Sequence, residues 1–164
     1  MAMLAAPVAQ AATEAKAPGP CLTPREIHGF VAFILPGITA GVVAKCRTTV
    51  SPTGYFNTRG AQLGERLAAG KDAAWPVARD AFNKISHDSA KDTAHLSDTT
   101  TRSLVEHEMV EQLTGQIPTA MCRDIESVIE PLDPLPTDNL VQFVSAIFGV
   151  AGRGDSKMRA CPSS

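Results

Sequence analysis

The chain has 164 residues, of which 44% are hydrophobic and 20% are charged, and its formal net charge is -2. This length is typical of one domain that can bury a hydrophobic core of its own. The small net charge argues against a nucleic-acid partner, and an aromatic content of only 5% argues against base-stacking or sugar-binding surfaces.

The first residues have the composition of the end of an export signal. Residues 4–11 read LAAPVAQA, a short apolar run with an A-x-A ending. We therefore expect residues 1–20 to be a signal-peptide remnant followed by a disordered stretch. The alternative is an Ala-rich tail that is not cleaved. Residues 21–164 are then expected to form a single helical domain with a flexible C-terminal tail.

The first helix of that domain has a clear start. Thr23 and Glu26 form a capping box, and Pro24 occupies the first helical position, where its missing N–H costs nothing. Apolar residues at helical spacing follow as far as residues 45–46, with Pro36-Gly37 expected to kink or split the helix. Its uncharged stretch is near the lower length limit of a membrane span. We favour a buried central helix and no transmembrane span, because that stretch contains a proline and three glycines.

Apolar residues recur at helical spacing along the rest of the chain, and no segment alternates as a strand does. Five further helices are predicted, at about 58–70, 73–85, 100–113, 118–129 and 137–150. Thr58 is expected to cap the first of these, and Thr137 or Asp138 the last. The sequence therefore predicts an all-α fold, a helical bundle of five or six helices with two disulfides.

The disulfides are expected from four cysteines, Cys21, Cys46, Cys122 and Cys161, which with the export signal indicate a periplasmic or extracellular protein. A straight helix between the first two cysteines would be about 33 Å long. Disulfide partners need Cα atoms within about 7 Å. If the helix only kinks and alternate helices run up and down, Cys46 pairs with Cys122 and Cys21 with Cys161. The rival pairing, Cys21 with Cys46 and Cys122 with Cys161, requires a hairpin at Pro36-Gly37.

One helix carries the only pattern with catalytic character. His107, Glu108 and Glu111 spell H-E-x-x-E, and His107 and Glu111 are spaced to contact one metal ion. A zinc peptidase has a histidine where Glu111 stands, so a solvated helix face is the competing interpretation. No nucleophile motif, glycine-rich phosphate loop or C-x-x-C is found. The sequence thus predicts no catalytic residue and no cofactor.

Four short segments carry a resemblance to a protein group: the LAAPVAQA remnant, Cys21-Leu22-Thr23-Pro24, Ala74-Trp75-Pro76 and Cys161-Pro162. The chain resembles small exported helical proteins of alphaproteobacteria that have no assigned function. The resemblance implies periplasmic residence and nothing about activity. A looser likeness, in size and helical content, is to periplasmic immunity proteins that neutralise secreted toxins.

Together these observations predict a non-enzymatic periplasmic or cell-surface protein that binds another protein, a second copy of itself or a small apolar ligand. The expected walls of its groove or dimer contact are the first and last helices, at Phe30, Ile34, Pro36, Phe143 and Phe148. One alternative is a metal-dependent hydrolase that uses the His107 helix. Another is a structural subunit of an envelope assembly.

Overall fold

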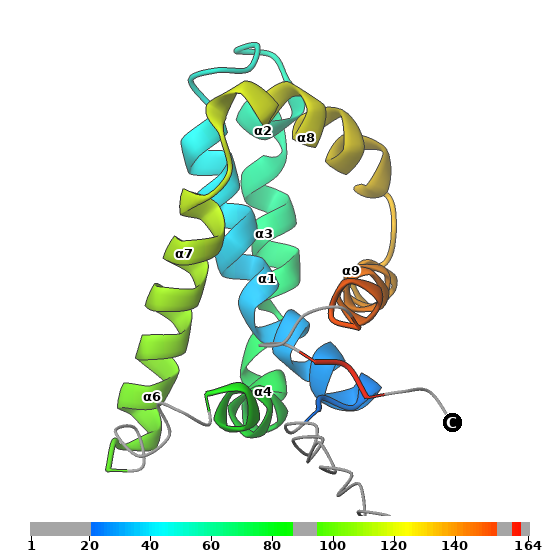
Figure 1. Ribbon diagram of the computed structural model, residues 1–164. Coiled ribbons are helices and arrows are strands. Elements are labelled where there is room, and N and C mark those ends of the chain that lie inside the picture. The colour runs from blue at the N-terminus through cyan, green and yellow to red at the C-terminus, as the bar shows by residue number, and fades with distance from the viewer. Residues whose placement is uncertain (1–20, 87–94, 154–158, 162–164) are drawn as a thin grey trace, which may run out of the picture.

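The computed structural model describes residues 21–86, 95–153 and 159–161, and one long helix, α1 (Pro24–Cys46), runs through its centre (Figure 1). The predicted capping box is present: the Thr23 hydroxyl accepts from the backbone N–H of Glu26, whose carboxylate accepts from that of Thr23. α1 continues through Pro36 without splitting and bends along its length, as both ribbon views show. Pro36 cannot donate a backbone hydrogen bond, which accounts for a bend at this level.

The remaining helices are short and are packed around α1. They are α2 (Tyr55–Thr58), α3 (Gly60–Ala68), α4 (Lys71–Ile85), α6 (Asp98–Leu104), a π-helical turn (Val105–Met109), α7 (Val110–Gly115), a 3-10 turn (Thr119–Met121), α8 (Cys122–Ile129), a second 3-10 turn (Glu130–Leu132) and α9 (Thr137–Ala151). The predicted all-α class is confirmed. The described residues contain one isolated β-bridge, between Leu22 and Ala160.

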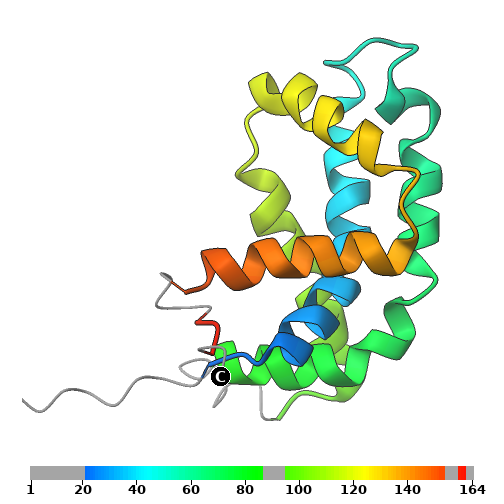
Figure 2. The same ribbon diagram turned by 90° about the vertical axis from the view of Figure 1, so that its right-hand side faces the viewer.

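The helices do not form a simple up-and-down bundle. α3 and the column of α6, the π-helical turn and α7 run beside α1, whereas α4 and α9 cross it and α8 lies over its C-terminal end (Figures 1 and 2). α1 contacts α3, α4, α7 and α9, so it is surrounded on several sides. Phe30, Val31 and Phe33 are consequently almost fully buried.

α1 is also long and apolar enough to cross a membrane, with a mean hydropathy of 1.9 over its most apolar window. Half of that window is buried inside the fold. Its position at the centre of the core already requires an apolar sequence on most of its sides.

Two glycines let α7 approach α1 closely. A Cβ atom on Gly37 would lie 2.7 Å from Val110 Cγ2, and one on Gly41 would lie 2.7 Å from Thr114 Cγ2. One turn further, the Lys45 ammonium donates to the carbonyl oxygens of Thr114 and the following residue, at 2.9 and 3.1 Å. α1 thus both packs against α7 and stabilises the negative end of its helix dipole.

The disulfides connect the two ends of α1 to distant parts of the chain. Cys46 pairs with Cys122 at one end and Cys21 pairs with Cys161 at the other, as the kinked-helix argument favours. The rival pairing is wrong because α1 does not reverse at Pro36. Backbone hydrogen bonds from Leu22 to residue 159 and from Cys161 to Leu22 hold residues 159–161 beside the start of α1. This part of the predicted tail is therefore a fixed element of the fold.

Several predicted helix starts differ from the structure. Residues 55–56 begin α2 inside the predicted loop, because both side chains are buried in the core. Thr58 caps no helix; its hydroxyl donates to the carbonyl of Gly54. α6 begins at Asp98, capped by Ser97, and not at about residue 100. α9 follows Pro136 with no side-chain cap, so neither Thr137 nor Asp138 has the predicted role.

Candidate functional site

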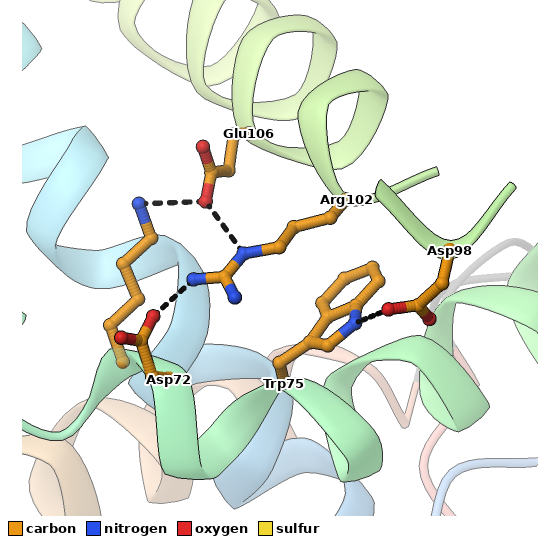
Figure 3. Close-up of polar contacts among 6 residues, drawn as sticks. Asp72, Trp75, Asp98, Arg102 and Glu106 are labelled. Carbon is orange, nitrogen blue, oxygen red and sulfur yellow. Dashed lines mark hydrogen bonds and ion pairs between the residues drawn. The ribbon is translucent and has the colours of Figure 1, made fainter. Parts of the chain in front are cut away.

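A polar network joins α4 to α6 and the π-helical turn (Figure 3). Glu106 accepts from Lys71 Nζ at 2.9 Å and from Arg102 Nε at 3.4 Å, and Arg102 also pairs with Asp72. Although partial burial raises the pKa of Glu106, hydrogen bonds and charge from Lys71 and Arg102 lower it below its usual value overall. The hydrogen bond and charge of Arg102 likewise lower the pKa of Asp72.

The same network covers an aromatic pair. The rings of Phe33 and Trp75 lie 4.8 Å apart, and Lys71 and Arg102 lie 5.4 and 5.5 Å from the centre of the Phe33 ring. Trp75 Nε1 donates to Asp98 at 3.0 Å, as Figure 3 shows. Each cation here contacts both a carboxylate and an aromatic face, so the cluster stabilises a helix junction and offers no ready site for a substrate.

The residues of the predicted metal site are exposed, but no further ligand lies near them among the described residues. His107, Glu108 and Glu111 are all exposed, and the first two lie in the π-helical turn. Within the described ranges no group of three or more histidine, cysteine or acidic side chains could hold a metal ion. The hydrolase hypothesis therefore has two candidate ligands, His107 and Glu111, and no third in this part of the chain. His87, a histidine of the sequence that could in principle serve as the distant ligand, lies outside the described residues.

The prediction that three residues of α1 line a groove is wrong. Phe30 and Ile34 are each 2% exposed, and Pro36 is buried, so all three belong to the core and line no open groove. On α9, Phe143 is 46% exposed, whereas Phe148 packs partly buried against the core. α1 and α9 nevertheless form a groove together, through a different set of residues.

This groove lies between the first turn of α1, α9 and the segment at residues 160–161, and its volume is about 420 Å³. It is lined by Leu22, Pro24, Ile27, His28, Gln142, Ser145, Ala146, Gly149, Val150, Arg153, Ala160 and Cys161. Small side chains on α9 leave this space open: a Cβ atom on Gly149 would meet only Ile27, at 3.9 Å. Ser145 adds little polarity, because its hydroxyl donates to the Val141 carbonyl of its own helix at 2.7 Å.

No described residue that lines this groove is acidic. The ionisable side chains among its described lining residues are His28 and Arg153. Glu26 on the same helix accepts instead from Lys84 Nζ at 2.6 Å and from the Thr23 backbone at 2.8 Å. Although partial burial raises the pKa of Glu26, these hydrogen bonds lower it overall. His28, for which a core or interface role is the favoured sequence interpretation, is exposed and also borders a second groove of about 310 Å³ beside α4.

The sequence reasoning missed Arg153, Ala146 and Gly149, because it assigned the first to a loose tail and sought groove walls among large side chains. The small residues on successive turns of α9 were the available signal, since a hollow forms where a helix presents little side-chain volume. Comparisons with protein-family models, curated proteins and solved structures give no match to this chain.

Proposed function

We propose that this protein is a non-enzymatic binding protein of the periplasm or cell surface that holds a small apolar ligand in the groove between α1 and α9. The groove itself carries the proposal: its volume is about 420 Å³, within the range of small-molecule sites, and its walls are mainly apolar. Two disulfides are typical of an oxidising compartment. The charged cluster around Arg102 is internally paired.

A groove-filling variant tests this function. Ala146 is exposed on the groove wall, so Ala146→Leu should occupy the space without entering the core. The oxidised full chain is titrated with the uncharged dye N-phenylnaphthylamine, whose fluorescence rises in apolar surroundings. We expect saturable binding that Ala146→Leu abolishes and that Val128→Leu, on the exposed surface of α8, leaves unchanged. Absence of binding to the unaltered protein, or equal binding to Ala146→Leu, refutes the proposal.

A second candidate function, binding of another copy of the chain, is favoured by the outer face of α9. Phe143, Ile147 and Val150 are 46%, 52% and 65% exposed and lie one turn apart. Residues 139–152 carry no charge, with Asp138 before them and Arg153 after them. Two such helices packed antiparallel would bury both apolar faces and bring opposite charges together at each end.

Light scattering after size exclusion measures this association. A concentration-dependent dimer that Phe143→Ser and Ile147→Ser dissociate would support it, and an invariant monomer would contradict it. Larger concentration-dependent oligomers would instead favour the remaining alternative, a structural subunit of an envelope assembly.

A further inference from the structure

We infer that the groove selects a single-chain amphiphile with a carboxylate head, with Arg153 as the residue that binds the head. This inference rests on the proposed function, because it names the chemical class of the ligand in the same groove. Three features of the groove carry it: the absence of acidic residues from its described lining, the number of donors it offers and the composition of its walls.

The charges disfavour a cationic ligand. Arg153 at the end of α9 and His28 on α1 are the ionisable residues of the lining, and the described lining residues include no carboxylate. The nearest acid on α1, Glu26, is held by Lys84 and by the start of its own helix. An anionic head therefore meets attraction here without a competing negative charge from the described lining.

The number of cations favours a carboxylate. A guanidinium binds one carboxylate in a planar, two-pronged arrangement. His28 adds one further N–H donor, which an imidazole supplies in either protonation state. One arginine with one neutral donor matches a single negative charge better than the double charge of a phosphate monoester.

The walls select the rest of the molecule. Ile27, Ala146 and Val150 are apolar, and the Ser145 hydroxyl is already engaged with its own helix. A ligand with hydroxyl groups along its length would lose hydrogen bonds to water without replacing them. An alkyl chain makes no hydrogen bonds to water and so loses none on binding. A fatty-acid-like carboxylate therefore fits both the apolar walls and the arginine.

Displacement of the uncharged dye from the oxidised full chain tests the inference. The probes are decanoate, decan-1-ol and decyltrimethylammonium, which share one alkyl chain and differ in charge. We expect decanoate to displace the dye at the lowest concentration and the cation at the highest. Arg153→Gln should weaken decanoate by about fivefold, as expected for a charge-assisted contact at a solvated rim, and leave decan-1-ol unchanged.

The matched control is Arg123→Gln, which removes an exposed arginine on α8 away from the groove. Equal affinity for decanoate and decan-1-ol, or unchanged decanoate affinity in Arg153→Gln, overturns the inference and leaves the proposed function intact. Dye binding that none of the three amphiphiles displaces also overturns it. Failure of the unaltered protein to bind the dye refutes the proposed function itself, so the two failures are distinct.

Discussion

Loss of the Cys46–Cys122 disulfide is expected to remove a large part of the free energy of unfolding. Both cysteines are completely buried, at the junction of α1 and α8. They are 76 residues apart, and for a loop of that size the chain-entropy model gives about 4.5 kcal/mol. Replacing both with alanine also removes buried sulfur atoms, which adds to the loss. We therefore expect Cys46→Ala with Cys122→Ala to destabilise the protein by about 4–6 kcal/mol.

Urea unfolding followed by circular dichroism measures this loss. With a typical urea dependence of about 2 kcal/mol per molar, the midpoint should fall by about 2–3 M. The comparison is Cys21→Ala with Cys161→Ala. Its cysteines are 140 residues apart and only partly buried, so the chain-entropy model gives about 5 kcal/mol without the added loss from buried sulfur atoms. A loss below about 1 kcal/mol for the buried pair would contradict the argument, because the entropic contribution alone exceeds that value.

Three further changes have expected outcomes in thermal or urea unfolding. Lys45→Met should cost about 1 kcal/mol, because the carbonyl oxygens at the end of α7 lose their cation, whereas Arg47→Met should cost little. Gly41→Val should lower the free energy of unfolding by about 1–3 kcal/mol, because the larger side chain displaces α7. Gly64→Ala should raise it by up to about 1 kcal/mol, since an added Cβ at position 64 meets nothing within 4 Å. The pKa of Glu106 is lower in the folded protein than in the unfolded chain. Its contribution to the free energy of unfolding is therefore present above about pH 4.5 and is lost as the pH falls through the folded pKa. Stability measured from pH 6 to pH 3 should therefore fall less steeply in Glu106→Gln, and an unchanged slope would refute this reading.

The features that the sequence predicts correctly depend on local chemistry or chain length. The start of α1 follows from the side chains of Thr23 and Glu26, which act on the backbone of the same turn. The length of α1 excludes a Cys21–Cys46 bond, because that helix keeps the two cysteines apart whatever the other helices do. Neither inference needs knowledge of tertiary packing, and the fold class follows similarly from helical spacing. The choice between the two remaining disulfide pairings did depend on an assumed up-and-down order of the helices.

The predicted groove residues fail because they depend on how helices cross. Most turns of α1 are apolar on several sides, so its sequence does not show that Phe30 and Ile34 face the core. α9 has a similar ambiguity, because residues 139–152 contain no charged side chain that would mark the face that holds Phe143 rather than Phe148. The right pair of helices was predicted, and the faces they present were not.

The π-helical turn is a second feature that the spacing of apolar residues does not predict. Residues 105–109 belong to a segment that the sequence presents as one α-helix, and an inserted residue per turn shifts every side chain after it. The spacing of His107 and Glu111 was interpreted on the geometry of a regular α-helix. His107 lies in the π-helical turn and Glu111 in α7 beyond it, so the geometry of one regular α-helix does not describe this pair.

The two disulfides have different roles in this fold. The Cys46–Cys122 bond lies within the core, where it joins α8 to α1 and is remote from the groove. Cys161 instead lines the groove, and its bond to Cys21 holds residues 159–161 against Leu22 as the third wall. Loss of the first should therefore act on stability. Loss of the second, whose cysteines are 140 residues apart, should lower stability by a similar amount in the chain-entropy model and should in addition loosen the wall between the ends of α1 and α9.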